Sequence, residues 1–360
     1  MTPAWLPELL ARHPACREED VLKALFQSLY GNGHLLGDAE TVRNRIAEET
    51  ASAGPGRGEP LIEPLGGWIR LNLRPAREAQ LPPAWIQAMM SASGPAPADP
   101  RDGRLQESVR ALDPLPGFSM ARLAALADGL DGLPSHSEAC RAAEQPAYRL
   151  LDSAWEPVIP LLCGIARLRS SESPLLITLD GPCGGGKSTL AAALGTVLGC
   201  TVLHMDDYVI PHAQKTPERL AKPGGNADAE RLCRELLNPL LAGQPGRYSP
   251  YDCRRDRLGE PRAVRPRPFI LLEGSCSNLP VLREKAALRI FLTEEPATQE
   301  ARLRQRCSPA QLEAYHHRWI PLEQAYFEAF ALPDPGCVLL RAEDLRLERL
   351  KLKPEGDVSA

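Results

Sequence analysis

Several features that mark other classes of protein are missing from this sequence. No apolar run approaches the roughly 18 residues that a membrane-spanning helix needs. The first residues lack the basic start and the long apolar core of a signal peptide. No C-x-x-C pair occurs among the ten cysteines, which are scattered through both halves of the chain. We therefore expect free thiols in a reducing compartment, and a cytoplasmic protein that does not cross a membrane.

A broad excess of basic charge is also absent. The formal net charge is −4 over 360 residues, which argues against a nucleic-acid-binding protein built on a basic face. The contents of 43% hydrophobic and 24% charged residues are ordinary for a soluble globular protein. The length favours two domains rather than one.

The most informative stretch is LLITLDGPCGGGKST, at residues 175–189. Its first five residues are aliphatic apart from one threonine and predict a buried parallel strand. Residues 181–188 then fit G-x-x-x-x-G-K-[ST], and apolar residues at helical spacing follow. Strand, loop and helix in this order are the context that a phosphate-binding loop (P-loop) requires. The alternative, a glycine-rich turn that matches by chance, does not explain the flanks.

The residue types of this loop suit a nucleotide and Mg²⁺. Glycines let the backbone N–H groups approach an anion, and the helix N-terminus adds partial positive charge. Lys187 can reach the β- and γ-phosphates of ATP, and Ser188 can ligand Mg²⁺. The candidate nucleotide-binding residues are Gly181, Gly184, Gly185, Gly186, Lys187, Ser188 and Thr189.

Two further predicted strands end in acidic residues. The strand at 201–205 leads into Asp206 and Asp207, and an apolar strand at 268–272 leads into Glu273. Ligands of open parallel sheets bind beyond the carboxyl ends of the strands, and we expect the acid pair one strand over from the P-loop. A solvated acid pair is the alternative. Beside a P-loop, we expect these acids to meet the acceptor hydroxyl and Mg²⁺.

A predicted helix at 297–306 places Arg302 and Arg306 on one face, four residues apart. Two arginines with no acid between them repel each other unless an anion lies there. A solvated face is the alternative interpretation.

The first 148 residues predict a smaller, mostly helical domain of unknown role. The sequence also favours one hairpin in this domain. Apolar and polar residues alternate at 69–73, Gly66-Gly67 links this run to the one before it, and that first run contains Pro64, which fits only an edge strand. No His/Cys cluster with metal-binding spacing occurs in this half. His34 and His136 stand alone in loops and are expected to be surface or capping residues, although they could also line a second site.

With these residues in view, the stretch 171–345 resembles the uridine kinase-like branch of P-loop small-molecule kinases. The matching segments are DGPCGGGKST, HMDDY, PGGN, YSPYDC, LLEGS, the arginine helix and RWIPLEQAYF. The resemblance implies an α/β domain over 149–350 with a doubly wound parallel sheet and a mobile lid. It implies ATP-dependent, Mg²⁺-assisted transfer of a phosphoryl group to a hydroxyl of a small molecule. We expect residues 351–360 to be a disordered tail.

The resemblance also implies roles for single residues. Asp206 would accept the proton of the substrate hydroxyl, and Asp207 would support Asp206 or the water shell of the metal. Glu273 would hold Mg²⁺ through water or bind the acceptor. Arg302 and Arg306 would be lid arginines on the transferring phosphoryl group. The remaining residues expected at the acceptor are Tyr208, Tyr251, Asp252 and Arg254.

Some departures leave the function open. Nucleoside kinases of this branch commonly follow their Tyr-Asp with an aromatic residue and a histidine, whereas Cys253, Arg254 and Arg255 follow here. Uridine is therefore in doubt as the acceptor. The arginines would suit an anionic acceptor, and they would equally suit a solvated rim of the site. The alternative functions are a nucleotide-dependent regulatory or binding module and a toxin-like kinase whose N-terminal domain binds a partner. The absence of an N-K-x-D motif lowers the case for a GTPase-like switch, and a homo-oligomer is left open.

Overall fold

The computed structural model describes residues 1–33, 36–94, 102–168, 173–253 and 255–349. Contacts within the chain divide it into two compact units, Met1–Ile159 and Pro160–Ala360. The division falls later than the expected boundary at 148, because the strand β3 (Tyr148–Asp152) completes a sheet of the first unit. The tail predicted at 351–360 lies outside the described residues. Of the helices in the described ranges, none is both long and apolar enough to cross a membrane.

The first unit contains an antiparallel sheet in the order β1-β2-β3 among its helices. Its predicted hairpin is present, with Pro64 on the edge strand β1, but β3 was not predicted. The description as mostly helical therefore misses part of the architecture. The elements are α1 (Trp5–Arg12), α2 (Glu18–Tyr30), α3 (Ala39–Ser52), β1 (Ile62–Leu65), β2 (Trp68–Asn72), α4 (Leu73–Glu78), α5 (Pro83–Ala92), α6 (Arg104–Arg110), α7 (Met120–Asp128), α8 (Glu138–Ala143) and β3.

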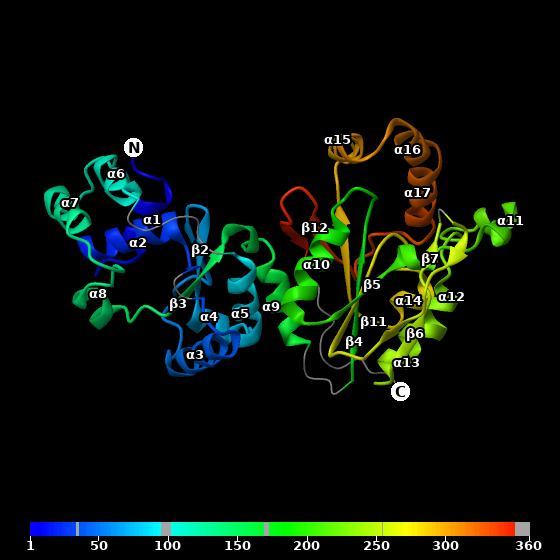
Figure 1. The fold of residues 1–360 in the computed structure, drawn as a ribbon, viewed down its shortest axis with the longest axis horizontal. Coiled ribbons are helices and arrows are strands. Elements are labelled where there is room, and N and C mark those ends of the chain that lie inside the picture. Colours follow the sequence, from blue (N-terminus) through cyan, green and yellow to red (C-terminus); the bar gives the residue numbers. More distant parts are fainter. Residues whose placement is uncertain (34–35, 95–101, 169–172, 254, 350–360) are drawn as a thin grey trace. The chain divides into compact units, whose positions relative to one another are not determined.

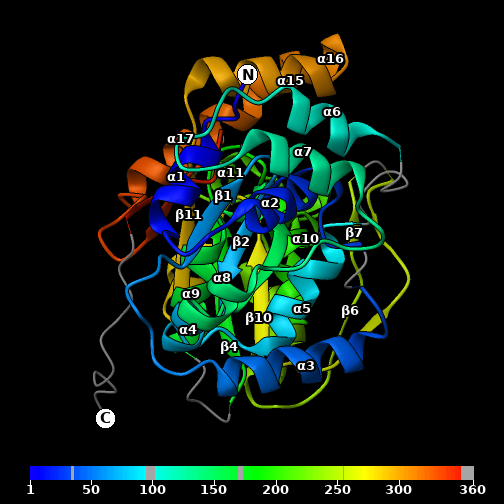
Figure 2. The same ribbon diagram turned by 90° about the vertical axis from the view of Figure 1, so that its left-hand side faces the viewer.

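Helical periodicity explains the core of this unit. Val21, Leu25 and Phe26 of α2 are almost fully buried and pack against Leu105 of α6 and Leu123 of α7. On another side of the unit, α3 packs along α5 (Figure 2). The apolar stripe of α2 thus holds α6 and α7 against it.

The second unit is built on a six-stranded sheet in the order β13-β12-β11-β4-β10-β5 (Figure 1). All neighbouring pairs are parallel except the edge pair β12–β13. The chain places β5 and β10 on one side of β4, and β11 and β12 on the other. This mostly parallel sheet confirms the expected α/β class, and it puts a topological switch point beside β4.

The strand order corrects one expectation about the acids. The strand that leads into Asp206 is β5, and β10 lies between it and β4. The acid pair is therefore two strands away from the P-loop. The immediate neighbour is β10, which ends at Glu273.

The strands of this sheet are β4 (Leu175–Asp180), β5 (Thr201–His204), β10 (Phe269–Glu273), β11 (Ala286–Thr293), β12 (Val338–Arg341) and β13 (Leu347–Arg349). Short strands outside it are β6 (Gly246–Tyr248), β7 (Tyr251–Asp252), β8 (Arg257–Leu258) and β9 (Arg262–Val264). The helices are α9 (Ile159–Arg167), α10 (Lys187–Leu198), α11 (Pro217–Leu220), α12 (Ala229–Leu232), α13 (Asn238–Leu241), α14 (Pro280–Arg283), α15 (Pro296–Arg306), α16 (Pro309–Ala314) and α17 (Ile320–Ala329).

Buried apolar strands explain why the sheet lies inside this unit. All residues of β10 are buried, and so are all residues of β4 except its first. Continuous apolar runs of this kind are typical of parallel strands that are covered on both faces. The helix α10 packs against β4, β5 and β10.

Candidate active site

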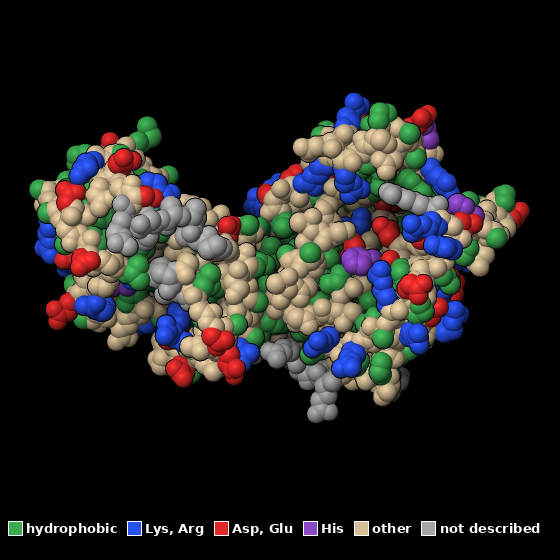
Figure 3. All heavy atoms as spheres, in the orientation of Figure 1, with side chains coloured by type: hydrophobic (Ala, Val, Ile, Leu, Met, Phe, Trp, Pro, Cys, Tyr) green, Lys and Arg blue, Asp and Glu red, His purple; other side chains and the backbone are tan. Residues whose placement is uncertain are grey.

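A cavity of about 820 Å³ opens at the carboxyl ends of β4, β10 and β5. Its volume is typical of a site for a small molecule. On the face shown in Figure 3, side chains of both charge signs surround a hollow under α15 and α16. The charged side chains among the lining residues are Lys187, Asp206, Glu273, Arg302, Arg306, Glu323 and Glu343.

The P-loop leaves the sheet at a position that requires glycine. Gly181 has φ +138°, and a Cβ there would lie 2.6 Å from the carbonyl oxygen of Leu292 in β11. A side chain would therefore push the loop away from the sheet. The loop then continues into α10, whose first residue is Lys187, as the motif predicts.

Lys187 is held across the loop. Its Nζ donates to the carbonyl oxygens of Gly181, at 2.7 Å, and of Pro182, at 2.9 Å. The side chain is largely buried but lines the cavity. The ammonium group is thus positioned at the floor of the loop, where a bound phosphate would meet it.

Ser188 and Glu273 face each other at the start of α10 and the end of β10. The Ser188 hydroxyl donates to the Glu273 carboxylate, 3.2 Å from each oxygen. His204 of β5 lies 2.6 Å from the same carboxylate through Nδ1. This hydrogen bond raises the pKa of His204 above its ordinary value, against the opposing effect of burial. His204 was not among the expected site residues, although it begins the HMDDY segment.

The neighbouring acids Asp206 and Asp207 have different surroundings. Asp206 lines the cavity, where desolvation by the surrounding protein and the charge of Glu273 raise its pKa. Asp207 is not among the lining residues and accepts a hydrogen bond from the Tyr248 hydroxyl at 2.9 Å. Tyr208 is buried, stacks on Tyr248 and lies under the Arg231 guanidinium. Of the three expected site residues in this segment, Asp206, Asp207 and Tyr208, the structure brings only Asp206 to the cavity wall.

Arg302 is paired with an acid that the sequence pattern did not indicate. Its guanidinium lies 2.6 Å from Glu294, which directly follows β11, and it also donates to the Ala342 carbonyl. The Glu294 side chain is fully buried, and burial raises its pKa. Its second oxygen has no partner among the described residues and lies beside the P-loop, 3.2 Å from where a Cβ on Gly185 would stand. Arg306 lines the cavity as well and donates to the Tyr315 hydroxyl.

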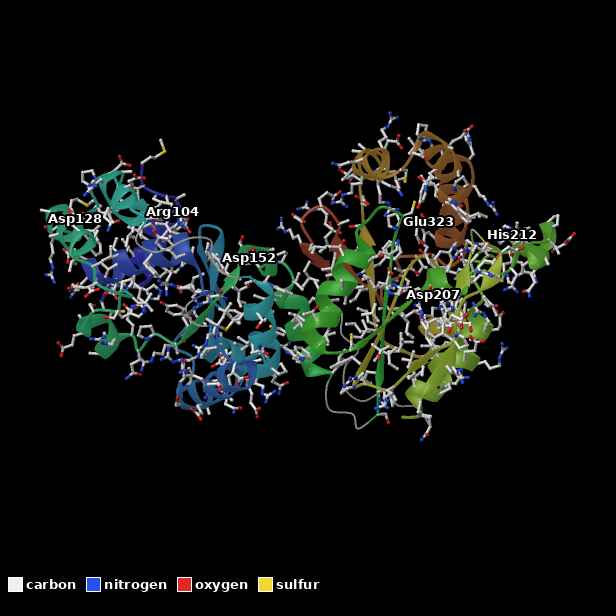
Figure 4. All side chains as sticks on the ribbon, viewed as in Figure 1. Arg104, Asp128, Asp152, Asp207, His212 and Glu323 are labelled. Atoms are coloured by element: carbon white, nitrogen blue, oxygen red, sulfur yellow. The ribbon has the colours of Figure 1, made fainter. Side chains whose placement is uncertain are left out.

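A second unexpected acid approaches the loop from α17. Glu323 accepts hydrogen bonds from the backbone N–H of Cys183, at 2.9 Å, and from the Ser275 hydroxyl. Figure 4 labels Glu323 and Asp207 in this unit. Both Glu294 and Glu323 lie far from the P-loop in the sequence and were missed as site residues. Glu323 belongs to the RWIPLEQAYF segment noted above, whereas Glu294 belongs to none of the matching segments.

The expected acceptor residues are only partly brought to the cavity. Tyr251 and Asp252 do not line it; Tyr251 donates to Asp256, and Asp252 pairs with Arg255. Arg254 lies outside the described residues. Asn226 and Cys253 do line the cavity.

Asn226 was missed as a site residue, although it belongs to the PGGN segment noted above. Its side-chain oxygen is buried without a hydrogen-bond partner among the described residues. An amide oxygen of this kind is available to a ligand hydroxyl or amine.

Comparison with solved structures finds similarity to chains that are described as kinases. A possible uridine kinase from Bacillus stearothermophilus is 23% identical, covering 50% of this chain and 96% of that chain, with a TM-score of 0.40. A putative fructose transport system kinase from Silicibacter sp. TM1040 is 24% identical, covering 47% of this chain and 93% of that chain, with a TM-score of 0.39. No family model matches the chain, and no curated protein matches it.

Proposed function

We propose that this protein is an ATP-dependent phosphotransferase that acts on a hydroxyl of a small molecule, in the manner of uridine kinase-like enzymes. The observation that carries the proposal is the convergence of Lys187, the Ser188–Glu273 pair and Asp206 on one cavity. A P-loop alone would support nucleotide binding. Asp206, an additional acid with a raised pKa, supports proton transfer from the hydroxyl of an acceptor.

The residues where the start of α10 faces the end of β10 fit Mg²⁺. Ser188 and Glu273 offer a hydroxyl and a carboxylate, the oxygen ligands that this ion prefers, and both face the cavity. They would hold the ion directly or through water. When bound, Mg²⁺ neutralises charge on the β- and γ-phosphate oxygens.

The other side chains of the cavity divide the remaining tasks. Asp206 accepts the proton of the acceptor hydroxyl, which leaves the oxygen free to attack the γ-phosphorus in line with the departing ADP. Lys187 and Arg302 offset the negative charge of the transferring group. Glu294 acts as a positioning residue, because it fixes the direction of the Arg302 guanidinium. The raised pKa of Asp206 makes it a stronger base than an ordinary carboxylate.

A metabolite-library screen for acceptor-stimulated release of ADP tests this proposal. We expect ATP turnover to depend on an added hydroxyl compound. Nucleotide binding without turnover for any acceptor would instead favour the regulatory or binding module.

We predict that Lys187→Ala abolishes this turnover while circular dichroism stays as in the wild type. The ammonium group carries charge to the phosphates, and in the structure it donates to two loop carbonyls and to the Ser275 hydroxyl. Residual activity within about tenfold of the wild type, about 1.4 kcal/mol, would contradict the assignment of the site.

A further inference from the structure

Two cysteines that are far apart in sequence meet in the first unit. Cys16 directly precedes the turn into α2, and Cys140 lies in α8; both side chains are buried, 9% and 2% exposed. Both are free thiols. No metal-binding spacing was found in this half of the sequence, because the two thiols come from segments more than a hundred residues apart.

Other metal-ligating atoms surround the same place. The Sγ atoms of Cys16 and Cys140 and a carboxylate oxygen of Glu144 lie within 4.8 Å of one another. Cys140 Sγ also belongs to a second group, with a His136 ring nitrogen and an Asp20 carboxylate oxygen, that meets the same limit. The two groups share only Cys140, and His136 does not lie within that distance of both Cys16 and Glu144, so an ion would draw the two groups together. All their members come from two short segments, 16–20 and 136–144.

Two of these residues stand just before a helix. Cys16 precedes the N-cap of α2, and His136 precedes the N-cap of α8. Cys140 lies in the first turn of α8, and Glu144 is its C-cap. The segments that enter α2 and α8, together with α8 itself, therefore bring the ligand atoms together.

The distance between two of these atoms suits a tetrahedral ion. His136 Nδ1 lies 3.7 Å from Cys140 Sγ. Bonds of about 2.3 Å to sulfur and about 2.0–2.1 Å to nitrogen at a tetrahedral angle place those atoms roughly 3.6 Å apart. The other ring nitrogen of His136 is 2.9 Å from the Tyr148 hydroxyl, a partner that fixes the ring orientation.

We propose that the first unit binds one structural Zn²⁺ ion through Cys16, Cys140, His136 and Glu144. Two thiolates, an imidazole and a carboxylate combine soft and borderline ligands. Ligands of this kind favour zinc over Mg²⁺ or Ca²⁺. When the ion binds, Asp20 gives up its bond to His136 Nδ1 and keeps its bonds from the Ser137 N–H and hydroxyl. One oxygen of Glu144 likewise leaves its present partner, His13 Nδ1 at 2.5 Å or the Ala15 N–H at 3.0 Å, and turns to the ion. The two thiols release their protons to solvent on binding. The ion ties the beginning of α2 to α8.

The first test is the metal content of the full chain, purified without added metal or chelator and measured by inductively coupled plasma mass spectrometry. We expect about one zinc per chain. Cys16→Ser and Cys140→Ser should each lose most of it, whereas Cys233→Ser, at a similarly buried thiol of the second unit, should keep it.

Because serine at a buried position could prevent folding, a second measurement uses the unmodified protein. After removal of metal, Co²⁺ should produce the absorption of sulfur-to-cobalt charge transfer, and one equivalent of Zn²⁺ should abolish it. Cys183→Ser, which alters a thiol at the nucleotide cavity, should leave this absorption intact. Purified protein without stoichiometric zinc that also gives no cobalt–thiolate absorption would overturn the proposal. A Cys16–Cys140 disulfide in freshly purified, non-reduced protein would overturn it as well.

Discussion

At the scale of single residues, Asp206 and Asp207 have the same side chain but different surroundings, because they occupy different positions in the turn after β5. The 3₁₀ turn at Met205–Tyr208 directs Asp206 to the cavity and Asp207 to the Tyr248 hydroxyl. Desolvation and the Glu273 charge act on the first, whereas a hydrogen bond anchors the second. We therefore propose Asp206, rather than Asp207, as the base.

We predict that Asp206→Asn lowers kcat by about 10²–10⁴ and changes the affinity for ATP little, because a general base acts in the transition state. Steady-state kinetics with the best acceptor and an ATP-binding titration measure both quantities. Asp207→Asn is the matched control. If it were the more damaging substitution, the assignment of the base would be wrong.

The raised pKa of Asp206 also predicts a pH dependence. The base works only when ionised, so kcat should fall as the pH falls through a pKa above the ordinary carboxyl value of 3.8. A kcat profile that stays flat down to that ordinary value would exclude Asp206 as the titrating base.

A third residue-scale prediction concerns the acceptor. Asn226 presents an unpartnered amide oxygen at the cavity. We expect Asn226→Ala to raise KM for the acceptor by roughly tenfold, the usual worth of one hydrogen bond, while KM for ATP stays near its wild-type value. An equal rise in both constants would point to a general disturbance of the cavity.

At the scale of elements, β11 and α15 cooperate through one ion pair. Glu294 at the end of β11 holds Arg302, which lies in the second turn from the end of α15. The two arginines four residues apart are not an unrelieved repulsive pair, as the sequence alone suggested, because Glu294 supplies the missing negative charge. Along the same helix, Glu300 pairs with Arg304 outside the cavity.

We predict that Glu294→Gln lowers kcat by tenfold or more with little change in KM for ATP. Glutamine keeps the shape of the side chain but removes the charge that orients Arg302. The control is Glu300→Gln, which weakens the surface pairs of Glu300 with Arg304 and His316 and should leave kcat within a factor of two or so. Equal effects of the two substitutions would refute a positioning role.

At the scale of the whole second unit, Asp180 joins three segments of the chain. It accepts hydrogen bonds from the N–H of Gly181, from the N–H of Asn278 and from the Tyr326 hydroxyl of α17. The side chain is fully buried, and burial raises its pKa to about 6 despite these donors. The end of β4, the loop after β10 and α17 are thereby held together behind the P-loop.

This burial predicts a pH dependence of stability. Between the ordinary value of 3.8 and about 6, the folded protein keeps a proton on Asp180 that the unfolded chain has released. The contribution of Asp180 to stability is therefore full below 3.8 and is lost as the pH rises through about 6. The stability difference between the wild type and Asp180→Asn, measured by denaturant unfolding, should shrink over this range. A constant difference would show that Asp180 is ionised throughout.

Local patterns in the sequence determined much of this protein. Aliphatic runs predicted β4, β10 and β11, and the glycine and lysine spacing predicted the turn into α10, because both depend on residues within a few positions of one another. The hairpin around Gly66-Gly67 was likewise predicted from residues that are neighbours in the sequence. The resemblance to P-loop kinases came from such short segments in the right order.

Only the tertiary structure decided which segments meet. The insertion of β10 between β4 and β5, the pairing of Glu294 with Arg302 and the approach of Cys16 to Cys140 all depend on packing between distant parts of the chain. A short pattern carries no information on such partners, since burial and long-range pairing select them during folding. For this reason Asp206 and Lys187 could be named from the sequence, whereas Glu294 and the thiol cluster could not, and Glu323 was noted only as part of the RWIPLEQAYF segment.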